Sequence, residues 1–401
     1  MVIDSRIAVV LCVQLNHCKA MITHIFFRRT LRPVTGLLLC ALAAAAGAFE
    51  AVEQDDPRFQ LEQLFDGLGV PWGMTFVAPR RLLVTERAGR ARLIDLESGS
   101  ATKVQGLPEI LARGQGGLLD VATGPAFATD GWIYFTYSKP HDGEAATTLA
   151  RARLDASRLV DWQDLLVTDS ATSSGQHFGS RIAFDESGHV FFGVGDRGDR
   201  DSSQEPRNHQ GTIMRLRLDG SVPRDNPFVG NGSARDEVWS FGHRNPQGMA
   251  FDPGARRLWS IEHGPRGGDE INLVLPGRNY GWPVVSHGKE YWGPLAVGEG
   301  TSKPGMEDPY KVYVPSIAPG SLMFYQGNAF PEWRGDLFSG ALKLRHLNRV
   351  SLAPDGEAIG EERLLEDLEE RIRAVIEGPE GYIYLSTDSG RILRLRPRPS
   401  E

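Results

Sequence analysis

The sequence predicts an all-β chain folded as a six-bladed β-propeller, with four-stranded blades and long loops inserted at one mouth of the central channel. Short runs rich in β-branched and aromatic residues alternate with turns, and the 401 residues include 46 Gly and 25 Pro. Helical periodicity is almost absent. One pattern, in which a polar loop joins a strand-like run to a second alternating run, recurs six times at a spacing of roughly 45 to 80 residues.

The six copies follow one another along the chain. Their paired runs begin at residues 81 and 91, 131 and 148, 188 and 211, 257 and 270, 335 and 347, and 381 and 390. The surplus length belongs mainly to inserted loops over residues 196–236 and 277–320. An early strand near Phe59–Phe65 is expected to close the ring by joining the last blade. A two-sheet sandwich is the alternative fold, but it explains six copies less well.

The N-terminus has the pattern of a leader for export. Three arginines precede the short apolar run 34–46, and Ala-Gly-Ala then ends at Ala48. We therefore expect residues 1–48 to be a cleaved signal peptide region, with Met21 as an alternative start, and residues 49–401 to be a single propeller domain. The run is too short for a membrane span, so the mature chain is expected to be periplasmic or secreted.

Composition narrows the partners of the mature chain. All three cysteines lie in the leader, so we expect neither disulfides nor thiol chemistry. Without residues 1–48 the chain keeps 39 basic and 50 acidic residues. A net acidic chain without a basic run argues against nucleic acid as a partner. A loop-rich propeller is compatible with either a monomer or a homodimer.

Two neighbouring loops are the richest in chemistry. Gly242-His-Arg-Asn-Pro-Gln-Gly contains Arg244 and Asn245, and the loop 263–272 reads His-Gly-Pro-Arg-Gly-Gly-Asp-Glu-Ile-Asn. Glycine and proline restrict the path of the backbone, whose carbonyl oxygens are then available to a hard metal ion. The guanidinium offers a planar fork of donors to anionic oxygens. These loops therefore predict an anion-and-metal site.

A candidate base lies on another copy of the repeat. His177 stands in a loop rich in Gly and Ser, where an imidazole is suited to general-base catalysis near neutral pH. Asp196 directly follows a strand-like run and would fix the tautomer of that imidazole. An exposed loop histidine is the alternative interpretation. Gln115, in a glycine loop, would offer its amide to a ligand, although such a loop also commonly leads into a strand.

A cationic group comes last in the chain. Arg371 and Arg373 alternate with an apolar residue, so both point to one side of a strand, and Lys343 belongs to the preceding copy. Two arginines on one side repel each other unless an anion lies between them or water surrounds them. In the alternative interpretation they form a solvent face with Glu369 and Glu370 as ion-pair partners. Taken together, the candidates indicate a polyanionic ligand, a base and a hard cation.

The chain resembles the soluble pyrroloquinoline quinone (PQQ)-dependent sugar dehydrogenases, and most closely their aldose sugar dehydrogenase branch. The resemblance runs from Val70 to Leu395. Its motifs are Gly114-Gln-Gly-Gly-Leu, His177-Phe-Gly-Ser-Arg-Ile, Gly242-His-Arg-Asn-Pro-Gln-Gly, His263-Gly-Pro-Arg-Gly-Gly-Asp-Glu-Ile-Asn, Asn279-Tyr-Gly-Trp-Pro and Arg371-Ile-Arg. It implies a six-bladed propeller that holds the quinone over the channel mouth.

The resemblance also implies roles for particular residues. His177 would be the base that takes the proton of the anomeric hydroxyl, and Asp196 would orient it. Arg244 and Asn245 would contact the quinone oxygens, with Arg244 stabilising the negative charge that develops there. The remaining implied cofactor contacts are Gln115, His263, Lys343, Arg371 and Arg373. The backbone carbonyls of Gly264 and Pro265 would hold a Ca²⁺ ion that also binds the cofactor, and Glu270 and Tyr280 would contribute to a second, structural Ca²⁺ site.

The leading hypothesis is therefore PQQ- and calcium-dependent oxidation of an aldose at C1 to the lactone, with electrons passed to an external acceptor. A calcium-dependent lactonase or esterase on a similar propeller is one alternative, because a metal and a histidine base also suit hydrolysis. A non-catalytic propeller that binds a partner is the other. Neither alternative explains why Lys343, Arg371 and Arg373 gather with His177 and Arg244.

Overall fold

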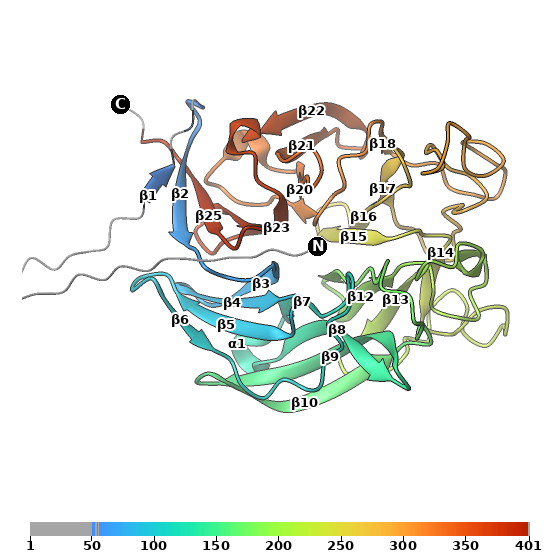
Figure 1. The fold of residues 1–401 in the computed structure, drawn as a ribbon, viewed down its shortest axis with the longest axis horizontal. Coiled ribbons are helices and arrows are strands. Elements are labelled where there is room, and N and C mark those ends of the chain that lie inside the picture. The colour runs from blue at the N-terminus through green and yellow to red at the C-terminus, as the bar shows by residue number, and fades with distance from the viewer. Residues whose placement is uncertain (1–49, 53, 55, 400–401) are drawn as a thin grey trace, which may run out of the picture. The chain divides into compact units, whose positions relative to one another are not determined.

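Six antiparallel sheets are arranged radially around a channel in the computed structural model (Figure 1), so the predicted six-bladed propeller is confirmed. The structure describes residues 50–52, 54 and 56–399, and the expected signal peptide and all three cysteines lie outside these residues. Residues next to or within the innermost strands of all six blades line one cavity in the channel. Across the described residues, no helix has the length and hydrophobicity needed to cross a membrane.

The strands of each blade follow one another in chain order, except that the last blade also contains β2 and β1 from the start of the chain. The first two blades contain β3 (Pro71–Ala78), β4 (Arg81–Glu86), β5 (Arg90–Asp95) and β6 (Ser100–Lys103), then β7 (Leu118–Thr123), α1 (Phe127–Asp130), β8 (Ile133–His141), β9 (Glu144–Asp155) and β10 (Arg158–Val167). The next two contain β11 (Ile182–Phe184), β12 (His189–Val194), η1 (Asp201–Gln204), β13 (Thr212–Arg217) and β14 (Val238–Phe241), then β15 (Pro246–Asp252), β16 (Arg257–Glu262), β17 (Asp269–Leu273) and β18 (Lys311–Tyr313). The last two contain β19 (Met323–Phe324), η2 (Pro331–Trp333), β20 (Leu337–Gly340), β21 (Leu347–Leu352) and β22 (Ala358–Leu364), then η3 (Glu366–Leu368), β23 (Ile372–Glu377), β24 (Ile383–Thr387), β25 (Ile392–Pro397), β2 (Phe59–Phe65) and β1 (Glu50–Val52).

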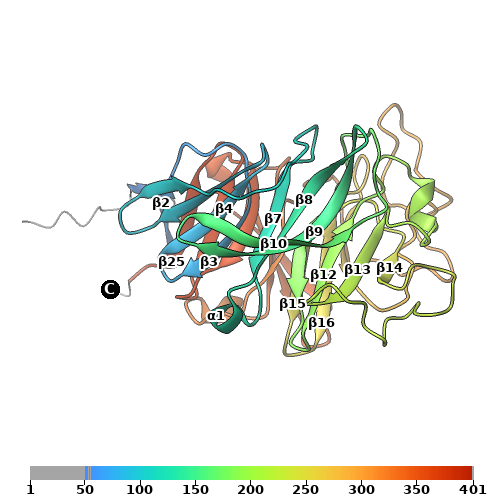
Figure 2. The same ribbon diagram turned by 90° about the horizontal axis from the view of Figure 1, so that it is seen from below.

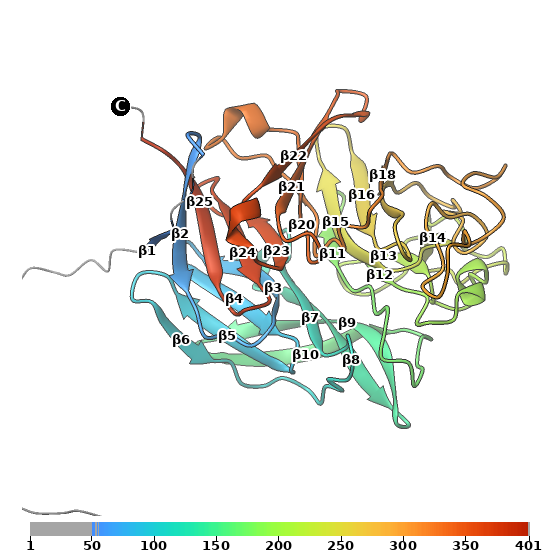
Figure 3. The same ribbon diagram turned by 45° about the horizontal axis from the view of Figure 1, so that its top comes forward.

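The two ends of the chain close the ring. β2 pairs antiparallel with β25, with Leu61 opposite Leu395, as predicted for the early strand (Figure 3). β1 adds to the free edge of β2, so this last sheet has five strands and not the predicted four. Ring closure by a segment so distant in sequence fastens the first and last blades together.

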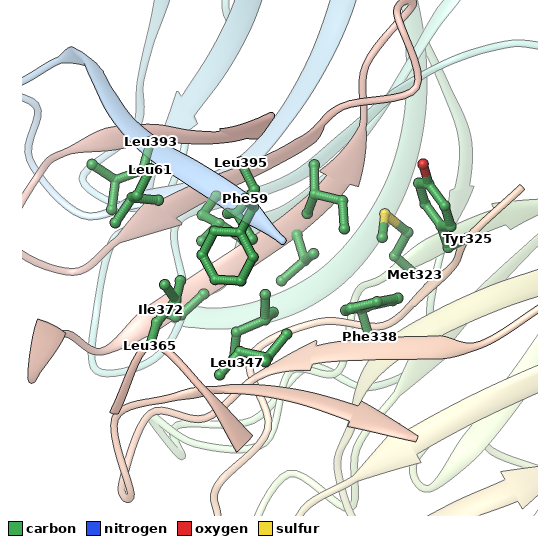
Figure 4. Packing of buried hydrophobic residues seen from close by; sticks show 14 of the residues in the cluster. Phe59, Leu61, Met323, Tyr325, Phe338, Leu347, Leu365, Ile372, Leu393 and Leu395 are labelled. Atoms are coloured by element: carbon green, nitrogen blue, oxygen red, sulfur yellow. The ribbon is translucent and has the colours of Figure 1, made fainter. Parts of the chain in front are cut away.

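Hydrophobic side chains fill the spaces between neighbouring blades. At the closure, Phe59 and Leu61 of β2 pack with Leu395 of β25 and with Phe338 and Leu347 of the preceding blade (Figure 4). These side chains are 0–1% exposed. Full burial of each contributes about 1.5–3 kcal/mol. The alternating pattern of the strands therefore encodes both the sheets and their packing.

The inserted loops are distributed over both faces of the ring. Successive strands of a blade are antiparallel and run between the two faces of the ring (Figure 2). The predicted insert 196–236 contains β13, as expected from the run that begins at residue 211, but the flanking loops 195–211 and 218–237 open at opposite faces and not at one mouth as predicted. Asp225 of the second loop lines a pocket with Asp185 at the β11–β12 turn. Only part of the inserted sequence therefore lies at the mouth that holds the candidate site.

Candidate active site

A buried histidine–carboxylate pair lies at one mouth of the channel. His177 precedes β11 and Asp196 follows β12, and the imidazole Nδ1 lies 2.5 Å from a carboxylate oxygen of Asp196. An ionised carboxylate can only accept a hydrogen bond, so Nδ1 carries the hydrogen and Nε2 keeps its lone pair. The structure thus brings the two residues together in the arrangement that a general base requires.

Neighbouring loops hold this pair in place. The amide oxygen of Gln115 accepts a hydrogen bond from the backbone N–H of His177 at 2.8 Å, which supports a backbone conformation with φ of 55°. Trp282 Nε1 donates to the second oxygen of Asp196, also at 2.8 Å, and the N–H of Gly198 donates to the first. The carboxylate therefore cannot rotate without losing three hydrogen bonds.

Burial sets the protonation states of the pair. It lowers the pKa of His177 despite the hydrogen bond to Asp196, and the nearby Arg244 lowers it further. Burial opposes ionisation of Asp196, yet the hydrogen bond from His177 holds the pKa of that carboxyl below its usual range. At neutral pH the imidazole is therefore neutral and the carboxyl is ionised, which is the state in which the imidazole accepts a proton.

A pH profile tests these states. The neutral imidazole is the active form, and burial lowers its pKa, so activity should fall only when the pH drops below the ordinary histidine value of 6.5. We expect kcat/KM to be level near neutral pH, with an acidic limb centred below 6.5. A limb centred above 6.5 would show that the acid form of His177 is stabilised in the folded enzyme. The limb should disappear from the residual rate of a His177→Asn variant.

A pocket with a cationic lining lies beside the pair. It contains the predicted residues Gln115, Asn245, His263, Arg371 and Arg373. The other side chains and glycine that line it are Trp72, Arg87, Phe178, Gly179, Gln247 and Leu342. Aromatic and apolar surfaces combined with a few convergent polar groups are typical of a site for a flat organic ligand.

The two predicted arginines share a carboxylate from their own blade. Arg373 donates to Asp388 from Nε and Nη2 at 2.9 Å each, and Arg371 Nε donates to the same carboxylate at 2.8 Å. The partners proposed in the solvent-face interpretation were Glu369 and Glu370, and that part was wrong: Glu370 pairs with Arg391. One carboxylate between two guanidinium groups leaves one positive charge uncompensated at the pocket.

Two further cations differ in their placement. Arg87, which was not among the predicted site residues, lines the pocket, and its guanidinium has no hydrogen-bond or ion-pair partner among the described residues. Lys343 is exposed, and only its neighbour Leu342 belongs to the lining. The structure therefore brings Arg87, Arg371 and Arg373 together but leaves the side chain of Lys343 outside the pocket.

Hydrogen bonds also hold the polar side chains that line this pocket. Asn245 Oδ1 accepts hydrogen bonds from the N–H of Gly179 and from Gln247 Nε2, both at 3.2 Å. His263 Nε2 lies 2.7 Å from the carbonyl oxygen of Pro319. Burial lowers the pKa of His263 to about 4, so this imidazole is neutral and its Nε2 carries the hydrogen.

Arg244 connects the base to the metal-loop candidate. Its backbone N–H donates to a carboxylate oxygen of Glu262 at 2.6 Å, and its Nη1 donates to the carbonyl oxygen of His263 at 3.1 Å. The guanidinium lies 5.2 Å from the ring centre of Trp282. Its Nε is buried and has no hydrogen-bond partner within the described part of the chain. A donor of this kind is available to a ligand oxygen.

The loop after β16 has a fixed backbone. The N–H of Gly264 donates to Asp269 at 2.9 Å, and the other oxygen of this fully buried carboxylate accepts bonds from Ser316 at 2.5 Å and from the N–H of Ala318 at 2.8 Å. A Cβ on Gly264 would lie 2.1 Å from the carbonyl oxygen of Gly268, so only glycine fits there.

A small acidic cavity lies next to this loop. Gly264, Glu262, Glu270 and Tyr280 all line it, whereas Pro265 does not. Burial and the neighbouring Glu262 raise the pKa of Glu270 to about 8. The Tyr280 hydroxyl is bonded to the backbone of its own loop, so only the carbonyl of that residue is available as a ligand. Among the described residues, no three His, Cys, Asp or Glu side chains are grouped to hold a metal ion.

Besides Arg87, sequence reasoning missed three residues that support the site. Trp282 belongs to the motif Asn279-Tyr-Gly-Trp-Pro, but no role was predicted for it. Asp388 follows the strand β24 as Asp196 follows β12, and Glu262 ends β16 immediately before the predicted loop. For Asp388 and Glu262, the available signal was therefore a carboxylate at the end of a strand near the mouth.

The fold and the site together define a class. The chain is a six-bladed propeller with a candidate base and a cationic pocket at one mouth, which is the arrangement of a propeller enzyme. Residues 68–394 match the sequence profile described as glucose/sorbosone dehydrogenase. The chain belongs to this dehydrogenase family.

The similarity of the chain to individual dehydrogenases agrees with this family assignment. The aldose sugar dehydrogenase YliI of Escherichia coli is 40% identical, over 84% of this chain and 93% of the relative. Quinoprotein glucose dehydrogenase B of Acinetobacter calcoaceticus is 28% identical, over 83% and 86%. The PQQ-bound aldose sugar dehydrogenase of Streptomyces coelicolor has a similar structure, with a TM-score of 0.71 at 26% identity over 86% of this chain and 99% of that one.

Proposed function

We propose that the protein oxidises an aldose at C1 to the lactone, with PQQ and Ca²⁺ as cofactors, and passes the electrons to an external acceptor. One observation carries the proposal: the His177–Asp196 pair lies beside a pocket lined by three arginines. Gln115 links the two, since it lines the pocket and bonds the backbone of His177. The relatives include a quinoprotein and a PQQ-bound enzyme, which supports the same chemistry.

The chain's own residues divide the reaction between them. His177 Nε2 would take the proton of the anomeric hydroxyl as the hydride leaves C1, so that a carbonyl forms there. Asp196 would stabilise the resulting imidazolium. When bound, PQQ supplies the acceptor for the hydride. Arg244 and Asn245 would bind the quinone oxygens, and the unpartnered Nε of Arg244 is a donor suited to that purpose.

The pocket fits a flat polyanion. Its three arginines face only one compensating carboxylate, Asp388, so an anionic ligand would remove an unfavourable excess of positive charge. Trp72, Phe178 and Leu342 supply apolar surface for a ring system. We infer that Arg371 and Arg373 bind the PQQ carboxylates, and that Gln115 and His263 also contact the cofactor. Lys343 would have to reorient in order to join them.

The acidic cavity fits a Ca²⁺ ion. A divalent cation would offset the repulsion that contributes to the raised pKa of Glu270, and Asn272 Oδ1, which is buried without a hydrogen-bond partner in the described structure, is an additional oxygen ligand. Glu270 and the carbonyl of Tyr280 would belong to this site. Gly264 and Pro265 carbonyls would hold the ion that contacts the cofactor, where it acts as a Lewis acid.

Calcium binding has a readout that does not depend on activity. We expect saturating Ca²⁺ to raise the Tm of the metal-free protein by about 5 °C, because ligand binding stabilises the folded state. Glu270→Gln should lose most of this increase, while Glu237→Gln, which alters a carboxylate paired with His209 outside the cavity, should keep it. An equal increase in wild type and Glu270→Gln would contradict the assignment of Glu270.

Reconstitution tests the proposed function. The apo-protein is mixed with PQQ and Ca²⁺, and aldose-dependent reduction of a dye is followed. We expect dye reduction that needs all three additions. Failure to bind the quinone at micromolar concentration, with Ca²⁺ present, would contradict the proposed function. Hydrolysis of lactones or esters by the same preparation without quinone would instead identify the alternative hydrolase.

A further inference from the structure

Two aromatic side chains stand exposed at the tip of the loop 286–297. Tyr291 is 63% exposed and Trp292 is 75% exposed, more than any other aromatic side chain among the exposed large hydrophobics of the described structure. The loop is nevertheless ordered by backbone hydrogen bonds. The N–H of Glu290 donates to the carbonyl of Leu295 at 2.8 Å, and a bridge pairs Lys289 with Ala296. We call this segment the aromatic loop.

Three arginines fasten the aromatic loop to the mouth of the channel. Arg200 donates two hydrogen bonds to Glu290, at 2.7 and 2.9 Å. Arg266 donates to a backbone carbonyl at the tip, at 2.6 Å. Arg244 Nη2 approaches the hydroxyl of Tyr291 at 3.4 Å. These arginines follow β12, β14 and β16, and the same three connections carry Asp196, Asn245 and the metal-loop candidate.

The same supports connect the aromatic loop to the candidate base through Trp282. The ring of Trp282 is contacted by the guanidinium groups of Arg200, at 5.4 Å, and Arg244, at 5.2 Å. The indole N–H of Trp282 donates to Asp196, the partner of His177. One tryptophan is therefore shared between the loop's anchors and the catalytic pair, and Arg244, which contacts the Tyr291 hydroxyl, is also close enough to His177 to lower its pKa.

The size and character of the tip indicate its ligand. Exposed rings on a restrained segment commonly mark a binding surface. Two rings and Leu295 cover far less than the ~800 Å² that each partner buries in a stable protein interface. A pyranose is small enough, and one of its faces presents C–H groups that pack against an aromatic ring, while its hydroxyls suit the tyrosine hydroxyl and the arginines.

We propose that Tyr291 and Trp292 form the wall against which the pyranose ring of the aldose packs while its anomeric hydroxyl meets His177. This inference rests on the proposed function, and it names residues that determine sugar specificity. Trp292 supplies stacking area. Tyr291 adds a ring whose hydroxyl is also in contact with Arg244.

Steady-state kinetics test the wall in the reconstituted holoenzyme. Trp292→Ala should raise KM for the aldose about ten-fold and leave kcat within about two-fold, because the lost contact acts on binding. Tyr291→Ala should act in the same direction, and Tyr291→Phe should retain most of the affinity because the ring remains. The matched control is Ile359→Ala, which removes a side chain that is 65% exposed on the outer strand β22 and should leave KM unchanged.

Other outcomes distinguish the wall from the proposed chemistry. An unchanged aldose KM in Trp292→Ala, with or without a raised KM for the acceptor, would contradict the packing of the sugar against Trp292. The proposed aldose oxidation would not be affected by that result. Ligand-observed NMR of aldose with the protein, without acceptor, gives a readout independent of turnover. Sugar binding that is lost in Trp292→Ala would support the wall even if no sugar were oxidised, in which case only the proposed chemistry fails.

Discussion

Replacing His177 by Asn is expected to lower kcat by about 10²–10⁴-fold, the usual contribution of a general base, while the affinity for PQQ stays within about three-fold. The large effect follows from the geometry, because Nε2 is the atom of the His177–Asp196 pair that is left free to take a proton. Asparagine is the suitable replacement because it tolerates the left-handed backbone conformation at this position. Stopped-flow reduction of the bound quinone by aldose measures the chemical step directly.

A second histidine–carboxylate pair provides the control. His189 Nδ1 lies 2.8 Å from Asp185, and both side chains are buried as they are in the candidate pair. His189 lines a different pocket, at the turn end of the same blade. His189→Asn should lower stability but leave kcat unchanged. Normal turnover in His177→Asn would show that another group removes the proton.

Replacing Arg371 and Arg373 together by Ala is expected to weaken PQQ binding by about 10²–10⁴-fold. Each charge-assisted hydrogen bond to a carboxylate contributes about 1.5–3 kcal/mol, and 1.4 kcal/mol corresponds to a ten-fold change in Kd. Both guanidinium groups line the pocket next to Asp388. Equilibrium titration with quinone, followed by its absorbance in the presence of Ca²⁺, measures the loss. At saturating quinone, kcat should recover, because neither arginine acts on the reacting carbon.

A second pair of arginines with the same spacing provides the control for this double variant. Arg151 and Arg153 of β9 also alternate with an apolar residue, but their guanidinium groups lie over Trp132, at 4.1 and 4.0 Å. The double variant Arg151→Ala/Arg153→Ala should bind PQQ with unchanged affinity. Because the alanines at 371 and 373 leave Asp388 unpaired, Asp388→Ala should be added to the double variant. Quinone affinity that returns to the wild-type value in this triple variant would contradict direct binding by the arginines.

The fold was predictable because its determinants are local and repeated. Each blade needs short alternating runs separated by turns, and the sequence contains six such copies. The early strand Phe59–Phe65 was recognisable as surplus to the six copies, and its pairing with β25 confirms its role in closure. A strand inside the insert 196–236 was expected, because a paired run begins at residue 211, but the loops on either side of it were expected at one mouth. A turn-rich sequence does not state at which face a loop opens. That depends on strand direction, which only the assembled blade defines.

The site was predictable where chemistry and local pattern coincide. His177 and Asp196 were paired on the residue types suited to a base and its orienting group, and the structure places them 2.5 Å apart. For Arg371 and Arg373, the ion-pair partners named in the alternative solvent-face interpretation were wrong. That interpretation named Glu369 and Glu370, but Asp388 is the partner, because β24 runs antiparallel to β23 and ends beside the start of β23.

By itself, the sequence determined the six-bladed fold, the dehydrogenase family and the residue types of the site, because strand periodicity and short motifs are properties of contiguous segments. Tertiary structure decided which side chains meet. It placed Arg87 in the pocket and Lys343 outside it, and it brought Trp282 to Asp196 across 86 positions of the chain. The physical reason is the ring itself, since the propeller gathers loops from separate blades at one mouth, and contacts between those loops depend on the closure of all six blades.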